Sequence, residues 1–379
     1  MLSLSPIEEA IQQALQRAED DETSVLLWLR RRFPPEVAAQ AVKQIALRQR
    51  AERKFSRAHQ MWFTPEGLEQ SSSETAATYH ASRFPRDVLV VDAGCGIGGD
   101  LVALAARGET AGVERDARTL LFAQRNAQVY EVSEHCALIH ADLLRLPLEK
   151  APFLFLDPSR RTGGRRTSAP SEWQPNWATV CQLAGTVHGA LVKSTPALRP
   201  QDIPTGCERE YLSIEGECRE LLLAFGECQQ GVALSALVLP VGARLCSTHA
   251  QPPPISPPRE WIYDPDPAVV AAQLLPELAE QLDGYLLHPR IAYLTASQQV
   301  DTPFARAYRL LEHFPYSRKR LLERLRAWQA GKITVKKRGV NLLPEQLVHA
   351  WKPQGDREIT VLLYRDESGV VALLAEPAR

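Results

Sequence analysis

Apolar residues recur at helical spacing through the first part of the chain. Val25 and Leu29 lie one helical turn apart, and Val37 and Ala41 continue the same period in a second stretch. Pro35 stands just before that stretch, in a position that suits the first turn of a helix. The pattern predicts a helical region over residues 1–80.

The pattern changes near residue 86, where short apolar runs begin to alternate with helical stretches. Short runs of this kind predict buried strands. The predicted strands are residues 88–91, 110–113, 137–139, 153–156 and 189–192, with helices between them at 99–107 and 117–128. Strands that alternate with helices predict an α/β fold, in which a parallel sheet is covered on both faces.

Two further apolar runs, residues 209–214 and 220–225, follow with a short connection between them. A connection this short predicts an antiparallel hairpin, because a parallel crossover needs a dozen residues or more. Residues 252–258, Pro-Pro-Pro-Ile-Ser-Pro-Pro, then form the clearest linker signal in the chain.

Helical and strand patterns continue beyond the proline-rich segment. The predicted helices are 267–282, 316–330 and 344–351, and the predicted strands are 291–295, 305–313, 332–338, 359–365 and 370–375. We therefore expect four parts. They are a helical region (1–80), an α/β domain (81–230), an α+β domain with a ferredoxin-like arrangement as one option (231–330) and a compact α+β domain (331–379).

The composition is that of a soluble globular protein, with 45% apolar and 23% charged residues. No stretch approaches the roughly 18 consecutive apolar residues of a membrane-spanning helix, and the N-terminus has no pattern of a secretion signal. The seven cysteines include no Cys-x-x-Cys pair and no histidine partner at metal-ligand spacing. We therefore expect a cytoplasmic protein with no metal site and no membrane partner.

A glycine-rich sequence, Asp92-Ala93-Gly94-Cys95-Gly96-Ile97-Gly98, stands where the first predicted strand runs into a helix. Glycines let the backbone turn tightly and approach a ligand without a Cβ in the way. Ligands bind at this carboxyl edge of open α/β sheets, where the helix N-terminus supplies free N–H groups. Dinucleotide-binding proteins use a related turn, so the turn alone does not identify the cofactor.

Acidic residues follow the next two predicted strands. Glu114 closes the second strand, where a carboxylate can accept hydrogen bonds from both ribose hydroxyls, and Asp142 follows the third, where it can accept from an adenine amino group. The alternatives are a solvated strand-end acid for Glu114 and a helix cap for Asp142. In this order along the chain, the turn and the acids closely resemble the class I S-adenosylmethionine (SAM)-dependent methyltransferases over roughly residues 86–228.

This resemblance implies a Rossmann-like core of seven strands that ends in an antiparallel hairpin, with SAM as the cofactor. The residues that it implies for cofactor binding are Asp92, Gly94, Cys95, Gly96, Gly98, Glu114, Arg115, Ala141, Asp142 and Asp157.

Asp157-Pro158-Ser159-Arg160 follows the fourth predicted strand and resembles the Asp-Pro-Pro-Tyr motif of methyltransferases that modify exocyclic amines. In that family the acid and the next carbonyl hold the amine, and the aromatic ring stacks on the base. The resemblance implies that these four residues are catalytic. Ser159 replaces the second proline and Arg160 replaces the ring, although an arginine plane also stacks on bases. Arg161 then opens a cationic loop, which either contacts phosphate or is a solvated surface loop.

The segment Met61-Trp62-Phe63-Thr64-Pro65-Glu66 resembles a segment of the cap guanine-N2 methyltransferases (trimethylguanosine synthases), although it is two residues shorter. The resemblance implies that Phe63 and Thr64 lie over the cofactor and that Trp62 lies near the substrate. The alternative is that the two rings only dock the helical region onto the core. Lys193, after the fifth strand, is a further candidate for substrate contact.

Charge is unevenly distributed along the chain, although the formal net charge is −1. Residues 306–338 hold eleven lysines and arginines against two glutamates, a net charge of +9. The region resembles the THUMP-like domains appended to bacterial methyltransferases, which implies that it binds RNA. The candidate contacts are Arg318, Lys319, Arg320, Lys336, Lys337 and Arg338. The alternative is a solvated basic face.

The sequence therefore predicts a SAM-dependent methyltransferase that acts on a base nitrogen of a structured RNA, a tRNA or rRNA, with Asp157 orienting the nucleophile. Two alternatives stay open. One is a methyltransferase for a small molecule or a protein, which the loss of the aromatic ring at Arg160 favours. The other is a SAM-binding RNA adaptor without catalysis. The target atom and the oligomeric state do not follow from the sequence.

Overall fold

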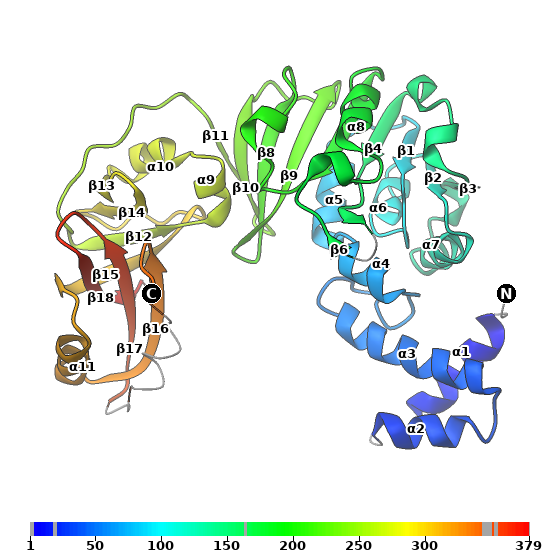
Figure 1. Ribbon diagram of the computed structural model, residues 1–379, viewed down its shortest axis with the longest axis horizontal. Helices are drawn as coiled ribbons and strands as arrows, with labels where there is room; N and C mark the ends of the chain where they lie inside the picture. Colours follow the sequence, from blue (N-terminus) through cyan, green and yellow to red (C-terminus); the bar gives the residue numbers. More distant parts are fainter. Residues whose placement is uncertain (1–3, 18–20, 163–164, 343–350, 352–354, 379) are drawn as a thin grey trace. The chain divides into compact units, whose positions relative to one another are not determined.

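The computed structural model describes residues 4–17, 21–162, 165–342, 351 and 355–378, which divide into two compact units (Figure 1). The first unit holds Met1–Ser194, Leu198–Cys207 and Leu223–Gln230, and the second holds Thr195–Ala197, Glu208–Leu222 and Gly231–Arg379. The proline-rich segment 252–258 lies inside the second unit, so this predicted linker does not separate the two.

Helices open the first unit, in agreement with the helical pattern of residues 1–80. They are α1 (Leu4–Leu15), α2 (Glu22–Leu29), α3 (Pro35–Ala51), α4 (Pro65–Gln70) and α5 (Glu74–Ser82). Asp21 caps α2 by accepting hydrogen bonds from the backbone N–H groups of Thr23 and Ser24. Prolines begin α3 and α4, where the missing N–H group would have no helical partner in any case.

A parallel sheet forms the centre of the first unit. Its strands are β1 (Val90–Ala93), β2 (Thr110–Glu114), β3 (Cys136–His140), β4 (Phe153–Leu156) and β7 (Gly189–Ser194), in the order β7-β4-β1-β2-β3. All five predicted strands are confirmed. The strands β1, β4 and β7 are buried along their whole length, which explains their short, largely apolar runs.

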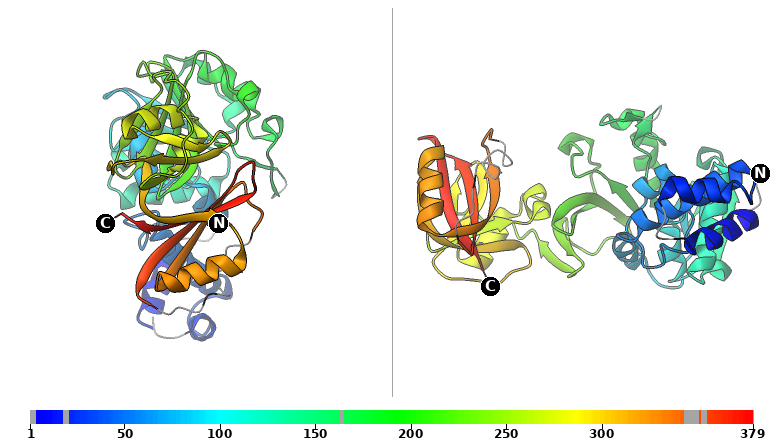
Figure 2. Two further views of the ribbon diagram at one scale, coloured as in Figure 1. Left: turned by 90° about the vertical axis from the view of Figure 1, so that its left-hand side faces the viewer. Right: turned by 90° about the horizontal axis from the view of Figure 1, so that it is seen from below.

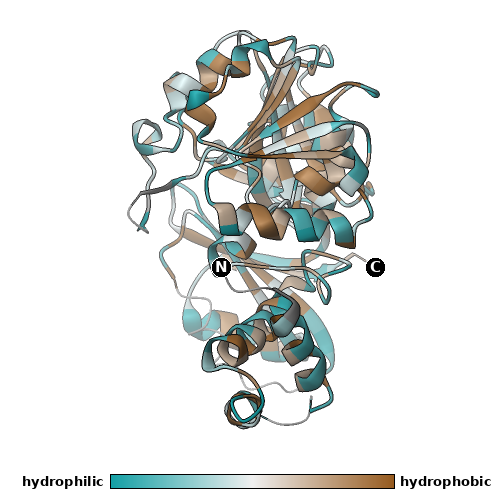
Figure 3. Cartoon of the chain, turned by 90° about the vertical axis from the view of Figure 1, so that its right-hand side faces the viewer, coloured by the Kyte–Doolittle hydropathy of each residue, from teal (hydrophilic) through white to brown (hydrophobic). Residues whose placement is uncertain are grey.

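The helices that connect these strands are α6 (Leu101–Ala105), α7 (Ala117–Val129) and α8 (Trp177–Ala184). Figure 3 shows the strands of this unit coloured mostly brown, while its helices carry both brown and teal stretches. This is the colouring expected of amphipathic helices that cover a buried sheet.

The N-terminal helices share a core with the α/β part of the first unit. Buried side chains of α1 and α3 pack in one cluster with Phe63, Ile97 and Phe122. Ile97 belongs to the glycine turn and Phe122 to α7. The predicted division at residue 80 therefore marks a change of secondary structure within one core.

The predicted hairpin is β8 (Glu208–Ile214) and β9 (Glu217–Gly226). Glu215 and Gly216 join the strands with φ of +54° and +79°, the geometry of a two-residue hairpin turn. The sequence did not predict β10 (Leu234–Leu239), which pairs in parallel with β8, or β11 (Ala243–Cys246), which pairs with β10. With them the sheet has nine strands, in the order β11-β10-β8-β9-β7-β4-β1-β2-β3. The predicted boundary at residue 230 is therefore followed by two more strands of the same sheet.

The rest of the second unit is built on a seven-stranded sheet in the order β13-β14-β12-β15-β18-β17-β16. Its strands are β12 (Trp261–Pro265), β13 (Tyr285–His288), β14 (Ile291–Ala296), β15 (Ala305–Pro315), β16 (Ala330–Arg338), β17 (Arg357–Arg365) and β18 (Val370–Pro377). The two α+β domains predicted on either side of residue 330 thus share one sheet, in which β15 pairs with both β12 and β18.

Helices accompany this second sheet. They are α9 (Pro267–Ala271), α10 (Leu275–Leu282) and α11 (Arg318–Ala327). The helix predicted over 267–282 is interrupted, because Gln273 takes a φ of +58° between α9 and α10. Leu321 and Leu325 of α11 pack against Ile359 and Val361 on one face of the sheet, and Figure 2 shows α11 alongside these strands. The helix predicted at 344–351 falls almost entirely outside the described residues.

In the described part of the chain, no helix is both long and apolar enough to cross a lipid bilayer.

Gln44 of α3 provides a test of how the N-terminal helices are held. The buried Gln44 amide donates to the Phe63 carbonyl at 2.7 Å and accepts from the Phe63 N–H at 3.0 Å. Gln44→Ala leaves both backbone groups without a partner, so we expect the free energy of unfolding to fall by about 2–4 kcal/mol in urea titrations followed by circular dichroism. Gln49→Ala, on an exposed position of the same helix, is the control. Equal losses in the two variants would contradict this account.

Candidate active site

The glycine turn after β1 leaves an open surface at the carboxyl edge of the sheet. Gly94, Gly96 and Gly98 have φ of +105°, +55° and +88°, values that residues with a Cβ rarely adopt. A Cβ on Gly94 or Gly96 would meet no atom within 4 Å, whereas one on Gly98 would lie 3.3 Å from the Cα of Ala123. The first two glycines therefore leave room for a ligand against the backbone, and the third lets α7 pack closely.

Glu114, at the end of β2, is tied to this turn through its carboxylate. Its Oε2 accepts from the Gly96 N–H at 3.2 Å, and its Oε1 accepts from the Asp116 N–H at 2.9 Å. The Cys95 N–H donates to the Val113 carbonyl at 2.9 Å, which fixes the turn against β2. Glu114 is half-buried, and each carboxylate oxygen has a second lone pair to offer to ribose hydroxyls.

Asp142 is exposed after β3, and its Oδ1 accepts from the Leu144 N–H at 3.1 Å. It therefore caps the turn that follows, as the alternative interpretation of the sequence states, while its second oxygen is not needed for the cap. The Ala141 N–H donates to the Glu114 carbonyl at 3.2 Å, which extends the ladder between β2 and β3. Arg115 is exposed and donates to the side-chain oxygen of Gln174 at 3.2 Å.

Asp92, near the end of β1, is almost completely buried, and its Oδ2 has no hydrogen-bond partner among the described residues. Burial, together with Asp100 and Asp157, raises the pKa of this carboxyl well above its ordinary value, although Lys193 acts in the opposite direction. A buried acid with an unpaired oxygen beside an open glycine turn is suited to a cationic ligand. SAM carries a sulfonium and an ammonium group, so these residues fit it.

Asp157 follows β4 and forms an ion pair with Lys193 of the neighbouring strand β7. The Lys193 Nζ lies 2.7 Å from the Asp157 Oδ2 and also donates to the Ser72 hydroxyl at 3.0 Å. Lys193 is only 7% exposed, and the next residue after Asp157, Pro158, is buried as well. The sequence suggested that Lys193 contacts substrate, whereas this geometry lets it act on a substrate through Asp157.

Polar contacts continue from Ser72 into the interior. The Ser72 hydroxyl donates to the Asp100 Oδ2 at 2.8 Å, and the Asp100 Oδ1 lies 2.7 Å from the Nδ1 of His80. The buried His80 ring stacks on Phe155 of β4, with 5.4 Å between ring centroids. Burial opposes the ionisation of Asp100, but His80, Lys193 and Ser72 outweigh it and lower the pKa of this carboxyl.

Sequence reasoning did not identify Ser72, His80 or Asp100. The position of Asp100, two residues after the glycine turn, is a signal that could have marked it. Ser72 and His80 carry no such signal, because their link to the strand ends exists only in the fold.

The chain leaves the site as an extended segment. Ser159 exchanges two backbone hydrogen bonds of 2.9 Å with Gln174, and the half-buried Arg160 follows it. Arg161 begins the short strand β5 (Arg161–Thr162), which pairs with β6 (Arg165–Arg166). The side chain of Arg161 is outside the described part of the structure. The cationic loop is thus a small hairpin next to the strand end that carries Asp157.

Trp62 and Phe63 lie in the interior, with 3% and 1% exposure. The Trp62 ring packs against Phe122 of α7, with 5.7 Å between ring centroids. This burial is what the docking interpretation predicts, since neither ring is presented to solvent.

Asn126 of α7 connects this segment to the glycine turn. Its side chain accepts from the Trp62 N–H at 2.8 Å and donates to the carbonyls of Trp62 and Ile97 at 3.0 and 2.8 Å. Thr64 caps α4 by accepting from the Gly67 N–H at 2.8 Å. A Cβ on Gly67 would lie only 2.5 Å from the Ile97 side chain. The first turn of α4 therefore rests directly on the glycine turn.

In the second unit, part of the predicted basic site is engaged within the fold. Lys336 and Arg338 of β16 both form ion pairs with Asp264 of β12, the latter at 2.8 Å. Lys337 donates to the Leu342 carbonyl. These three cations of β16 are therefore already bound to oxygen atoms of the protein itself.

The cations of α11 are arranged differently. Arg318, Lys319 and Arg320 are exposed at its first turn. Arg320 lies over the Phe314 ring, 4.9 Å from its centroid. Across the described ranges, Arg318 and Lys319 have no hydrogen bond or ion pair from their side chains. The start of α11 thus presents unneutralised positive charge to solvent.

The variant Asp92→Asn tests the effect of this carboxyl on folding stability and on SAM binding in two separate measurements. Because the folded protein raises the pKa of Asp92, this group costs stability as the pH rises from the ordinary value of 3.8 through the raised pKa. We expect the amide to increase the free energy of unfolding by about 1–3 kcal/mol at pH 8, with the gain vanishing as the pH falls toward 3.8. Urea titrations at several pH values measure this, and calorimetry should show SAM binding weakened at least about tenfold. Glu134→Gln, at an exposed acid, is the control. An increase in the free energy of unfolding that does not vary with pH would contradict a raised pKa for Asp92.

Comparison with protein families gives two matches on this chain. Residues 88–183 match the family model described as RNA cap guanine-N2 methyltransferase. Residues 305–377 match the model described as THUMP domain-like. The first match covers the glycine turn, the strand-end acids and Asp157, and the second covers β15, α11 and β16–β18.

Two curated relatives, from Mycobacterium tuberculosis strains CDC 1551 and H37Rv, are described as uncharacterized SAM-dependent methyltransferases. Each is 29% identical over 331 residues, which cover 84% of this chain and 90% of the relative. A crystal structure described as that of a candidate methyltransferase from Porphyromonas gingivalis W83 matches with a TM-score of 0.81 and 22% identity, over the whole of both chains. The glycine turn and these matches show a SAM-dependent methyltransferase whose residues 305–377 are similar to THUMP-like domains.

Proposed function

We propose that the protein transfers the methyl group of SAM to a base nitrogen of a structured RNA, a tRNA or rRNA. The observation that carries the proposal is the Asp157 carboxylate, which follows β4 at the same sheet edge as the glycine turn and is tied to Lys193 at 2.7 Å. A fixed carboxylate at this place can accept a hydrogen bond from a base N–H group and orient the nitrogen.

SAM supplies a methyl group on a good leaving group, so positioning of the nucleophile is the main task of the protein. Asp157 does this with its carboxylate, which Lys193 holds from the protein side, and Lys193 is itself positioned by a second hydrogen bond to Ser72. Gly94 and Gly96 leave the space in which the cofactor meets the base. Asp92 lies beside that space with one carboxyl oxygen that has no hydrogen-bond partner among the described residues.

An RNA substrate is supported by the cations of the second unit. Arg318 and Lys319 are exposed on α11, within the region that matches the THUMP-like model. Cations without protein partners bind phosphate at the smallest cost, because no internal ion pair has to be broken first. The family model that matches residues 88–183 is also named for an RNA substrate.

The decisive experiment is nucleoside mass spectrometry of RNA from a strain lacking the gene, beside its parent. We expect one methylated nucleoside to disappear and to return with the wild-type gene. It should not return with Asp157→Asn, because the amide no longer accepts in the same way and loses its ion pair with Lys193. Glu149→Gln, at an exposed carboxylate shortly before β4, should restore it fully.

Other outcomes distinguish the alternatives. Labelled methyl groups that enter protein or small molecules instead of RNA would favour the second class of substrate, for which Arg160 in place of an aromatic ring is the supporting observation. SAM binding in calorimetry, without turnover on any cellular RNA, would favour a non-catalytic adaptor.

The cations of α11 give a second test. The double variant Arg318→Gln/Lys319→Gln removes two exposed charges, and we expect about tenfold weaker binding of unfractionated bacterial tRNA at 0.1 M salt. The slope of log affinity against log salt should fall by about 1.4–1.8, the value for two phosphate contacts. Arg86→Gln/Lys150→Gln makes the same change in charge at exposed positions elsewhere. Equal effects of the two double variants would remove α11 from the binding site.

A further inference from the structure

A second concentration of positive charge lies in the N-terminal helical region. Residues 30–64 hold nine lysines and arginines against two glutamates, a net charge of +7. This segment includes α3 and leads directly into α4. The functional role of its charge depends on which cations are already bound within the protein.

Several of these cations are structural. Arg48 donates to the Met61 carbonyl at 2.9 Å, and burial lowers its pKa. Lys54 donates to the carbonyls of Leu68 and Ser71 at 2.7 and 2.9 Å. Arg57 forms an ion pair with Glu131 at 2.9 Å. These side chains hold the segment around α4 in place and are committed to protein oxygens.

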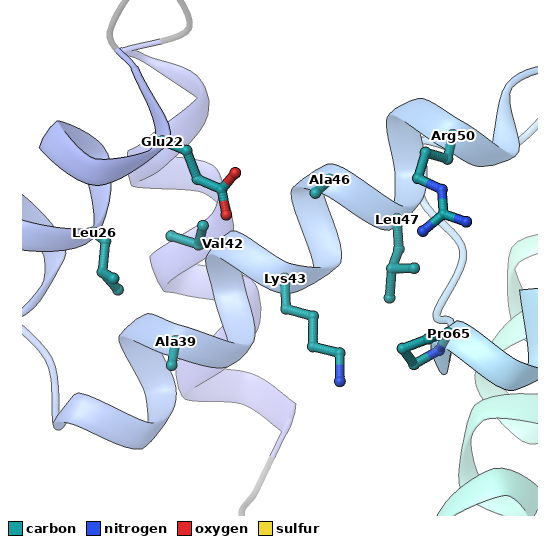
Figure 4. Close-up of a pocket in the computed structure, with 9 residues that line it drawn as sticks. All are labelled: Glu22, Leu26, Ala39, Val42, Lys43, Ala46, Leu47, Arg50 and Pro65. Carbon is teal, nitrogen blue, oxygen red and sulfur yellow. The ribbon is translucent and has the colours of Figure 1, made fainter. Parts of the chain in front are cut away.

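Lys43 and Arg50 of α3 are different. Both are exposed, and neither side chain has a hydrogen bond or ion pair with any residue that the structure describes. Seven residues separate them, which is two helical turns, so both lie on one side of α3 and about 10 Å apart along its axis. Figure 4 shows Lys43, Leu47 and Arg50 reaching from α3 toward the space beside Pro65.

These two cations border a groove between α2, α3 and the start of α4. Its walls include Leu26, Val42, Leu47 and Pro65, and Glu22 lies at the α2 side. The volume is about 290 Å³, at the lower limit of the pockets that enclose small ligands, about 300–1,000 Å³. An open groove of this size with an apolar floor and a cationic border suits one part of a larger anionic chain.

The groove and the glycine turn share a neighbour, the helix α4. Pro65 lines the groove and begins α4, whose cap is Thr64. The same turn rests on Ile97 of the glycine turn, and Asn126 bonds both Ile97 and Trp62. An RNA strand bound in the groove would therefore lie against the same helix that packs on the glycine turn.

We propose that this groove binds the RNA substrate beside the nucleotide that is methylated, with phosphates on Lys43 and Arg50 and ribose or base faces on Leu47 and Pro65. The proposal rests on the proposed function and adds a contact surface in the first unit. Glu22 repels phosphates, so it restricts the strand to the α3 side of the groove. The sugar–phosphate chain matches both the charge of the border and the apolar floor.

The test compares Lys43→Gln/Arg50→Gln with Arg30→Gln/Arg31→Gln in the full-length protein. Both double variants remove two exposed cations of the same region that have no partner in the described structure, but only the first pair lines the groove. With unfractionated bacterial tRNA as the probe, we expect the groove variant to bind about tenfold more weakly and to lower the salt slope by about 1.4–1.8. The control should change the slope by less than half as much. Lys43→Arg/Arg50→Lys should restore the affinity.

SAM affinity, measured by calorimetry, should be unchanged in all these variants, which shows that the first unit is folded. If the wild-type protein binds tRNA and the groove variant matches either the wild type or the control, the groove proposal is overturned while the proposed function stands. In that case Lys43 and Arg50 would bind another anionic partner, such as an acidic protein. If the wild-type protein neither binds nor methylates RNA, the proposed function itself fails.

Discussion

The site depends on three carboxylates at one edge of a parallel sheet, the buried Asp92 and Asp100 and the half-buried Asp157. Charges of one sign inside a protein repel each other strongly, so the arrangement requires positive groups at fixed places. Lys193 provides one, 2.7 Å from Asp157, and the ring of His80 lies 2.7 Å from Asp100. Among the described residues, the Oδ2 of Asp92 has no hydrogen-bond partner, and the glycine turn opens beside it. A cationic cofactor therefore completes a charge balance that the protein leaves unfinished.

Local patterns were sufficient to predict the five parallel strands of the first unit, the glycine turn and the hairpin. Buried strands appear in a sequence as short apolar runs, and turns have characteristic residues. The strands β10 and β11 were missed because they follow a predicted domain boundary and extend a sheet whose other members are far away in sequence. The acids at the strand ends could be anticipated from strand order. The bond between Lys193 and Ser72 could not, since it joins residues 121 positions apart.

Charge density was a good guide to a region and a poor guide to individual residues. In the sequence, Lys336 and Arg338 resemble Arg318 and Lys319, since both pairs lie in short basic runs. In the fold, Lys336 and Arg338 form ion pairs with Asp264, whereas Arg318 and Lys319 are exposed. Aromatic residues raise the same problem. Trp62 stands in a segment whose resemblance places it near the substrate, while the fold buries it against Phe122. Only tertiary structure shows which polar and aromatic groups have already found partners.

Asn126 connects two parts of the first unit, since its side chain donates hydrogen bonds to the carbonyl of Ile97 in the glycine turn and to the carbonyl of Trp62. A catalytic fragment that began near residue 81, at the apparent start of the α/β pattern, would lose the Trp62 side of this link. It would also expose Ile97 and Phe122 to water. For anyone trimming, fusing or recombining this enzyme, the smallest transferable module of the first unit therefore begins with the N-terminal helices.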